Sequence, residues 1–224
     1  KRMDGNWESP FNPLAVGRAY TEATAWQYRF FVPHDVNGMI QLFGGKEEFV
    51  AALDDIFNTD AEIHGNLVDI TGLIGQYVHG NEPSHHIAYL YNYVGEPWKT
   101  QKMSRRLLNE MYHPTPEGII GNEDCGQMSA WYILSSMGLY SVCPGSNEYV
   151  LTTPLFEKVV VHLANGRTLT ILANDPQKNI YITKVELNGK QIDTNFITYD
   201  CLMGGGELRF TLSDKPNKSL SLIH

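Results

Sequence analysis

The sequence lacks a surplus of positive charge. Its 224 residues include 17 lysines and arginines against 25 aspartates and glutamates, and the formal net charge at pH 7 is -8. Proteins that bind nucleic acids usually gather basic residues on one face. The densest basic run, Lys99 to Arg106, follows a helical pattern, and such runs more often form a solvated helix face than a binding patch. The charge balance therefore argues against a nucleic-acid partner.

Cysteines are few and long hydrophobic runs are missing. Cys125, Cys143 and Cys201 are widely spaced and odd in number, which predicts neither a disulfide framework nor a zinc site. We expect them to be small buried hydrophobic residues. No run approaches the roughly 18 apolar residues of a membrane span, and the first residues show no signal-peptide pattern. The opening, Lys1 to Trp7, resembles the interior of a loop, so we expect a piece of a longer protein.

Aromatic residues, by contrast, are plentiful. They make up 11% of the chain, with 4 tryptophans and 12 tyrosines, and several stand beside carboxylates rather than inside long apolar runs. Sugar-binding sites have this composition, but ordinary protein cores have it too. Composition alone leaves both interpretations open.

The hydrophobic pattern changes near residue 145. Before about residue 140, apolar residues recur at helical spacing between glycines and prolines, and after the Cys-Pro-Gly sequence at 143–145 they alternate in short strands. We predict a mainly α chain with a β tail: a helical region at 1–145 and a β-sandwich-like segment at 146–224. The predicted helices cover 46–57, 84–94, 98–111 and 125–139, and the last is apolar enough to be buried on most sides.

Turn signals separate the strands of the second region. The dipeptides Asn165-Gly166 and Asn188-Gly189 are typical of tight hairpin turns. The predicted strands cover 159–163, 169–172, 179–187, 191–199 and 207–212, with three glycines at 204–206 as a flexible connection. Nothing in this region gathers acids or histidines, so we expect it to be structural.

A first polar cluster surrounds Glu22. On a helix, Glu22 and Trp26 would share a face, and the indole would disfavour the charged carboxylate. The pKa of Glu22 would then rise, as a general acid requires. A carboxylate that faces solvent at the start of a helix is the alternative, and the local pattern alone favours it.

The second cluster, from His79 to His86, holds an amide, a carboxylate and three imidazoles within eight positions. The oxygens of Asn81 and Glu82 suit a hard cation such as calcium, whereas the histidines suit zinc or hydrogen bonds to sugar hydroxyls. The zinc-protease pattern His-Glu-x-x-His is not matched. For His85 or His86 taken alone, a purely structural role is as open as a functional one.

The third cluster places Glu123 and Asp124 directly before the apolar helix. The N-terminus of a helix favours negative side chains, which accounts well for a single acid. Two acids beside Asn122 and Gln127 suggest more, because a carboxylate kept ionised there could activate water as a general base.

Four ordered strings together resemble glycoside hydrolase family 92. They are Tyr-Thr-Glu-Ala-Thr-Ala-Trp-Gln-Tyr from position 20, Val-Pro-His-Asp-Val from 32, His-Gly-Asn-Glu-Pro-Ser-His-His from 79 and Gly-Asn-Glu-Asp-Cys-Gly-Gln-Met-Ser-Ala-Trp-Tyr from 121. The resemblance covers essentially the whole chain and is weaker in the β tail. It implies an inverting, calcium-dependent exo-α-mannosidase with an N-terminal β-sandwich and an (α/α)6 barrel. This chain would form the later helices of that barrel.

The resemblance also implies roles for individual residues. Glu22 matches the general acid and Asp124 the general base, although the family often has two adjacent aspartates where this chain has Glu123 and Asp124, so either could be the base. The implied metal ligands are Asn81, Glu82 and Gln27, and the implied substrate-binding residues are Trp26, His34, Asp35, His85 and His86.

The implied substrate is a mannose-containing glycan, with α-1,2 as the expected linkage. Inversion needs room for a water molecule, so the acid and base carboxyl groups should lie roughly 6.5–9.5 Å apart. The implied location is secreted, periplasmic or cell-surface, and the implied partner is the N-terminal part of the same enzyme. The alternative is a non-catalytic fragment that binds carbohydrate or serves a structural role.

Overall fold

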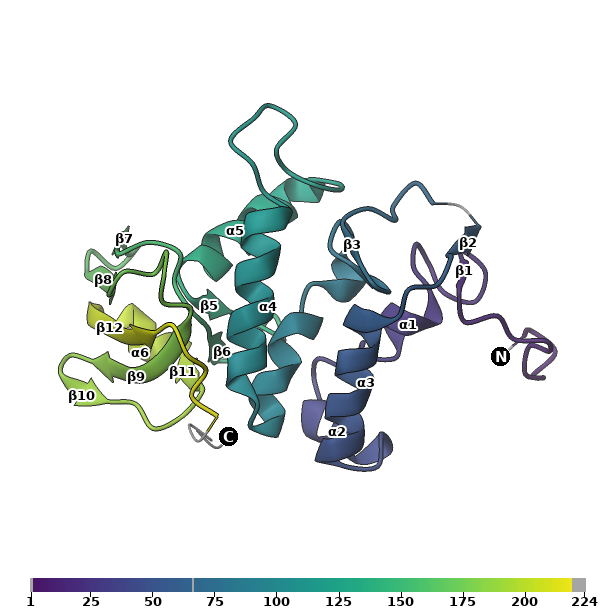
Figure 1. Ribbon diagram of the computed structural model, residues 1–224, viewed down its shortest axis with the longest axis horizontal. Helices are drawn as coiled ribbons and strands as arrows, with labels where there is room; N and C mark the ends of the chain where they lie inside the picture. Colours follow the sequence, from purple (N-terminus) through teal and green to yellow (C-terminus); the bar gives the residue numbers. More distant parts are fainter. Residues whose placement is uncertain (1, 66, 219–224) are drawn as a thin grey trace.

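Helices form the first region of the molecule and two sheets form the second (Figure 1). The computed structural model describes residues 2–65 and 67–218. The helices are α1 (Ala25–Tyr28), α2 (Val36–Leu42), α3 (Lys46–Asn58), α4 (Pro97–Glu110), α5 (Gln127–Ser136) and α6 (Tyr199–Met203), with 3-10 helices η1 (Glu82–Ser84), η2 (Ile87–Val94) and η3 (Asp124–Gly126). Two-stranded pairs join β1 (Ala15–Val16) to β2 (His64–Gly65) and β3 (Leu73–Ile74) to β4 (Tyr77–Val78).

Two of the predicted long helices are confirmed by α3 and α4. In α3, Phe49, Leu53 and Ile56 recur at helical spacing and are fully buried, which is the amphipathic stripe expected of such a helix. The predicted helix at 84–94 is wrong in type, because this segment forms η1 and η2. Over so short a segment, apolar spacing does not separate 3.0 from 3.6 residues per turn.

The helix predicted at 125–139 is shorter and less buried than expected. Cys125 and Gly126 have φ angles of 53° and 81°, a left-handed conformation that a right-handed helix cannot include. The α-helix therefore begins at Gln127. It buries one face through Met128 and Trp131, while Ile133 on the other side is 54% exposed.

Two sheets make up the β tail. The larger has the order β10-β9-β12-β8-β7, and the smaller has the order β11-β6-β5. The larger sheet consists of β7 (Lys158–His162), β8 (Thr168–Ala173), β9 (Tyr181–Leu187), β10 (Lys190–Gln191) and β12 (Gly206–Ser213), and the smaller of β5 (Leu139–Tyr140), β6 (Glu148–Leu151) and β11 (Phe196–Thr198). The single strand predicted at 191–199 is wrong, because β10 and β11 lie in different sheets. The hairpin of β7 and β8 is confirmed as antiparallel.

The predicted sheet content of the tail is confirmed, and its two sheets share one core. Leu151 and Ile197 of the smaller sheet belong to the same buried cluster as Ile171, Leu208 and Phe210 of the larger one. Side chains from two packed sheets interdigitate in this way in β-sandwiches. The partial (α/α)6 barrel remains a prediction.

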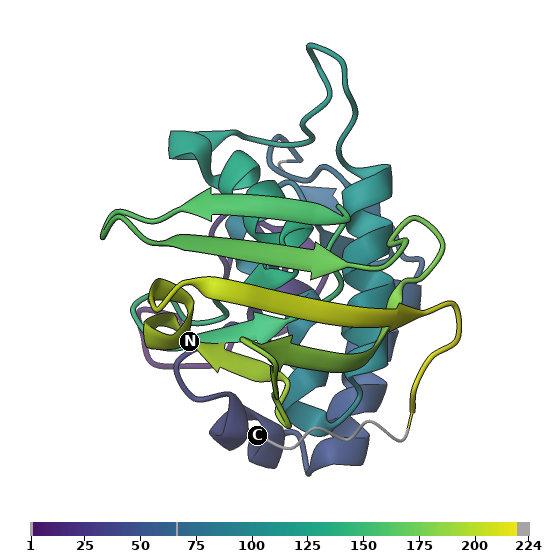
Figure 2. The same cartoon turned by 90° about the vertical axis from the view of Figure 1, so that its left-hand side faces the viewer.

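Helix α4 joins the helical region to the β tail. The amide oxygen of Gln101 accepts a hydrogen bond from the backbone of Ile182 in β9 at 3.0 Å, and the hydroxyl of Ser104 lies 2.7 Å from that of Thr152. Figure 2 shows α4 behind the larger sheet. Residue 150 of β6 also belongs to the core of the helical region. Contacts therefore cross residue 145, and the domain boundary placed there remains a prediction.

The expectation of buried cysteines is wrong. Cys125 and Cys201 are exposed free thiols, and Cys143 is partly exposed. Cys125 lies in the left-handed turn before α5, and Cys201 lies in the short surface helix α6. Local turn geometry decided these positions rather than side-chain hydrophobicity.

Candidate active site

The first polar cluster forms the N-terminal end of α1. Thr24 caps the helix by accepting a hydrogen bond from the backbone of Trp26 at 3.1 Å. Gln27, which is fully buried, completes a capping box: its amide oxygen accepts from the backbone and the hydroxyl of Thr24 at 2.7 and 2.8 Å. Its amide nitrogen donates to the carbonyl of Gln76. The side-chain oxygen of Gln27 therefore already accepts two hydrogen bonds within the capping box.

Glu22 does not share a helix face with Trp26, and the predicted arrangement is wrong. The helix begins only at Ala25, and Glu22 lies in the loop before it, with an exposed side chain and a φ of 57°. Trp26 instead packs against the core, with the guanidinium of Arg29 at 4.3 Å from its ring centre. The indole is therefore occupied by a cation-π contact rather than by the carboxyl group.

The string at 32–36 begins α2. One carboxylate oxygen of Asp35 accepts from the backbone of Gly38 at 2.8 Å, so Asp35 caps this helix. A side chain at position 38 would collide with that carboxylate, since an added Cβ would lie 2.2 Å from it. His34, next to it, is exposed. Their roles in substrate binding remain predictions.

The second cluster is largely buried, with one exposed carboxylate. Asn81 is buried and donates its amide to the backbone oxygen of Glu22 at 3.0 Å. Glu82 opens η1, and its side chain reaches solvent. His85 and His86 are buried, and their Nε2 atoms lie 2.9 and 2.7 Å from the carbonyls of residues 79 and 30.

The two histidines are neutral and have a defined tautomer. Burial lowers the pKa of His85 and of His86 to about 4, because desolvation disfavours the charged imidazolium. A carbonyl can only accept, so each Nε2 carries the proton, and each Nδ1 is left as a hydrogen-bond acceptor. Such an acceptor can bind a sugar hydroxyl without changing its charge at physiological pH.

His79 links this cluster to α5, although its sequence pattern did not single it out from its neighbours. Its Nδ1 lies 2.9 Å from the hydroxyl of Tyr77, and its Nε2 lies 2.9 Å from the hydroxyl of Tyr112. Tyr112 donates its own proton to the carbonyl of Met128 at 3.3 Å, so it accepts from His79. Burial lowers the pKa of His79 to about 3. The signal for His79 was its place in the second polar cluster, whereas Tyr112 carried none.

The third cluster separates the two candidate bases. Both carboxylate oxygens of Glu123 are engaged by Ser129, one by its backbone at 3.1 Å and the other by its hydroxyl at 2.9 Å. Asp124 begins η3 and is exposed. Within the described ranges, the carboxylate of Asp124 has no hydrogen-bond partner, so it is the freer of the two acids to accept a proton. Gln127 donates to the carbonyl of Asn122 at 2.7 Å.

Backbone contacts bring the three loops together. The Asn81 amide holds the carbonyl of Glu22, and the backbone of Asn122 donates to the carbonyl of Gly80 at 3.4 Å. Gly80 and Gly121 touch directly, since a Cβ added to Gly121 would lie 2.4 Å from the Cα of Gly80. The loop that carries Glu22 thus adjoins the Asn81 loop, which in turn adjoins the loop that carries Asp124. The glycine pair was missed because its purpose becomes visible only when the loops meet.

A cavity of about 540 Å³ opens beside these loops. Its polar lining includes Glu82, His85, His86 and Gln127, and its aromatic lining includes Phe31 and Trp131. The side-chain oxygen of Gln127 is buried without a hydrogen-bond partner in the described structure, so it is a ready acceptor. Aromatic faces and converging acceptors suit the apolar faces and hydroxyls of a sugar.

The described residues supply only part of a calcium site. Calcium takes about six to eight oxygen ligands, and the exposed carboxylate of Glu82 and the amide oxygen of Asn81 suit that chemistry. Gln27 does not, because its oxygen already accepts two hydrogen bonds. In the part of the chain that the structure describes, no three histidine, cysteine or acidic side chains gather closely enough to hold a metal ion.

Glu22 and Asp124 are thus exposed acids on two loops that both adjoin the loop of Asn81, and an aromatic cavity lined with hydrogen-bond acceptors lies beside that loop. The glycosyl hydrolase family 92 catalytic domain matches residues 1–214. The chain belongs to this family.

Relatives with solved structures agree with this assignment. A family 92 α-mannosidase of Bacteroides thetaiotaomicron, solved in complex with mannoimidazole, is 41% identical with a TM-score of 0.92, and the match covers 98% of this chain and 30% of that one. An inverting family 92 mannosidase of the same species is 38% identical with a TM-score of 0.85, and the match covers 98% and 31%.

A curated relative is described as an uncharacterized secreted glycosidase of Arthroderma benhamiae. It is 34% identical over 195 residues, which covers 85% of this chain and 23% of that protein. The chain therefore spans less than a third of each of these three relatives. Within the described ranges, no helix combines the length and apolar character needed to cross a membrane.

Proposed function

We propose that this chain carries the general acid and the general base of an inverting exo-α-mannosidase. In this proposal Glu22 protonates the departing glycosidic oxygen, and Asp124 removes a proton from the attacking water. The observation that supports it best is the chain of contacts from Glu22 through Asn81 and Gly80 to the loop of Asp124. These contacts join loops about one hundred positions apart in the sequence.

Local contacts favour Asp124 over Glu123 as the base. A general base needs a lone pair that is free to accept the proton of water. Glu123 uses both of its oxygens on Ser129, so it stiffens the loop that positions Asp124.

The proposed substrate is a glycan that ends in α-mannose, with the α-1,2 linkage as the first candidate. Both matched bacterial structures are mannosidases by their descriptions. The cavity beside the loops has room for a hexose, and the neutral His85 and His86 would accept hydrogen bonds from its hydroxyls. Trp26, His34 and Asp35 stay substrate-binding candidates, although Trp26 and Asp35 have structural contacts.

Calcium is proposed as the cofactor, with Asn81 and Glu82 as its ligands from this chain. When bound, it would add positive charge beside the sugar hydroxyls. Further oxygens would come from the substrate, from water or from the remainder of the enzyme. That remainder is also the proposed partner, and a secreted, periplasmic or cell-surface location is proposed in line with the secreted relative.

The acid role is tested by Glu22→Gln in the full-length enzyme. We expect a loss of about 10²- to 10⁴-fold on a natural mannoside and little loss on an aryl mannoside with a very acidic leaving group, which needs no proton. Equal losses on both substrates would refute the acid role. Asp124→Asn should abolish turnover of both substrates, whereas Glu123→Gln should retain more activity. The reverse order for these two variants would move the base to Glu123.

A non-catalytic role in carbohydrate binding is the second candidate, because the chain spans less than a third of its matched relatives. Turnover of an aryl α-mannoside by this chain and by the full-length enzyme, each with and without a chelator, separates the two. Binding of mannose without turnover by the chain alone would favour the second candidate. Activity that is indifferent to chelation would refute the calcium role.

A further inference from the structure

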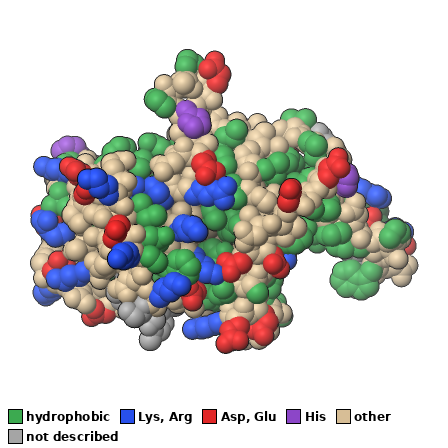
Figure 3. Space-filling model, viewed as in Figure 1, with side chains coloured by type: hydrophobic (Ala, Val, Ile, Leu, Met, Phe, Trp, Pro, Cys, Tyr) green, Lys and Arg blue, Asp and Glu red, His purple; other side chains and the backbone are tan. Residues whose placement is uncertain are grey.

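Helix α4 carries a basic run that the proposed mechanism does not use. Its sequence pattern predicts a solvated face, and Figure 3 shows lysine and arginine side chains over α4 on one side of the molecule. Arg105, however, is only 6% exposed. The prediction of a solvated face is therefore wrong for this residue, and its buried charge needs an explanation.

A cavity of about 400 Å³ lies between α3 and α4. Lys99, Lys102, Arg105 and Arg106 line it, and Asp54 is the one carboxylate among its described lining residues. Polar and aromatic side chains, including Asn109 and Trp98, complete the wall. No lining residue is shared with the cavity beside the candidate active site.

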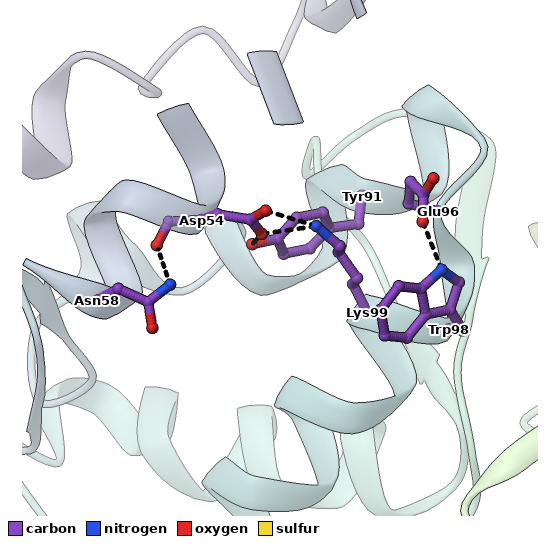
Figure 4. Close-up of polar contacts among 6 residues, drawn as sticks. All are labelled: Asp54, Asn58, Tyr91, Glu96, Trp98 and Lys99. Carbon is purple, nitrogen blue, oxygen red and sulfur yellow. Dashed lines mark hydrogen bonds and ion pairs between the residues drawn. The ribbon is translucent and has the colours of Figure 1, made fainter. Parts of the chain in front are cut away.

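Two of the four cations already have carboxylate partners. The ammonium of Lys99 binds Asp54 at 2.5 Å, and the Tyr91 hydroxyl donates to the same carboxylate at 2.9 Å (Figure 4). Arg106 binds Glu110, one turn further along α4, at 2.9 Å. The carboxylate of Asp54 is thus fully used, and it leaves no negative charge for the remaining cations.

Lys102 and Arg105 have no carboxylate partner among residues 2–65 and 67–218. Arg105 donates to the carbonyls of Pro154 and Pro176, and these bonds satisfy donors without neutralising the charge. Among the described residues, its buried Nε has no hydrogen-bond acceptor. Burial lowers the pKa of Arg105 below its ordinary value, because desolvation disfavours the charged guanidinium. A buried charge of this kind is costly unless an anion accompanies it.

We propose that this cavity binds a phosphate or sulfate group, either as the free anion or as the ester of a small molecule. Arg105 and Lys102 would provide the charge, because a guanidinium and an ammonium are the preferred partners of such oxyanions. Asn109 would add a neutral donor. The volume admits an oxyanion together with a group about the size of one sugar. This site is independent of the proposed mannosidase activity.

Isothermal titration calorimetry of the chain with sodium phosphate and with sodium sulfate, at an ionic strength held constant with sodium chloride, tests the proposal. We expect saturable binding at one site, and about tenfold weaker binding in Lys102→Gln. Lys158→Gln is the matched control, because it removes the same charge from an exposed position on β7. It should bind like the unmodified chain.

Arg105→Lys keeps the charge but loses the planar fork, so it should also weaken binding. If that variant does not fold, Lys102→Gln alone decides the outcome, since its side chain is exposed. Titration with a hexose 6-phosphate distinguishes a site for the free anion from a site for a phosphate ester. Tighter binding than that of inorganic phosphate indicates an ester, and weaker binding indicates the free anion. Absence of saturable binding, or equal weakening in Lys158→Gln and Lys102→Gln, would overturn the proposal.

Discussion

Gly121→Ala should push apart the two loops that carry Glu82 and Asp124. Gly121 has a φ of 80°, and an added Cβ would lie 2.4 Å from the Cα and 2.5 Å from the carbonyl oxygen of Gly80. Both of these are backbone atoms, so no side chain can rotate away. The left-handed backbone costs an alanine about 1–2 kcal/mol, and overpacking typically costs about 1–3 kcal/mol more. We expect the free energy of unfolding to fall by about 2–5 kcal/mol.

Gly166→Ala is the matched control, because Gly166 has the same φ of 80° and no described atom lies within 4 Å of its added Cβ. It carries the backbone cost alone, about 1–2 kcal/mol. Urea denaturation at equilibrium measures both variants. The full-length enzyme should also lose turnover with Gly121→Ala but retain it with Gly166→Ala.

The result that would refute this reasoning is a free energy of unfolding for Gly121→Ala within about 0.5 kcal/mol of that for Gly166→Ala. The two loops would then move apart at no measurable cost in free energy, and the contact of Gly80 with Gly121 would not hold the loop of Asp124 in place. A large loss of stability with unchanged turnover would support the close contact of Gly80 with Gly121. It would also show that this contact is not needed for turnover.

Three further predictions concern buried polar groups. Burial lowers the pKa of His79 to about 3 and of His85 and His86 to about 4, so the unfolded chain, with histidine pKa values near 6.5, binds protons first as the pH falls. The free energy of unfolding should be level above pH 7 and should fall below it, by up to about 1.4 kcal/mol per pH unit for each histidine, until the pH approaches 4. Urea denaturation across this range checks it, and a shallower slope in His86→Gln would identify one contributor. Asn81→Asp replaces the buried amide donor by a carboxylate that faces the carbonyl of Glu22, and it should lower the free energy of unfolding by about 1–3 kcal/mol. An unchanged urea midpoint would contradict a stabilising hydrogen bond between Asn81 and Glu22. Gln27→Glu should destabilise the chain, because it removes the amide donor that bonds the carbonyl of Gln76. Calcium binding that tightened in this variant would instead support Gln27 as a metal ligand.

Local patterns in the sequence were sufficient for most of the regular structure. The stripe of Phe49, Leu53 and Ile56 predicted α3, because one apolar face must be buried whatever it packs against. The dipeptide Asn188-Gly189 predicted a hairpin, and both of its residues do have positive φ angles, 52° and 76°. These features depend on neighbours in the chain, so a sequence reveals them.

Features that depend on distant neighbours were predicted less well. The strand expected at 191–199 is divided because its halves pair with β9 and β6, which belong to different sheets. The predicted contact of Glu22 with Trp26 failed because the cap at Thr24 starts the helix too late to include the acid. Hydrophobic spacing does not show which strand will pair with which, or which residue will cap a helix.

The sequence by itself determined the family and the positions of the three polar clusters, because these lie in short ordered strings. Only the tertiary structure decided which atoms remain free for chemistry. Ser129 donates hydrogen bonds to Glu123, whereas the carboxylate of Asp124 has no such partner among the described residues. Thr24 donates to the side-chain oxygen of Gln27, and burial keeps His85 neutral. Hydrogen-bond partners and desolvation come from residues that are distant in the chain, so they appear only when the fold brings those residues together.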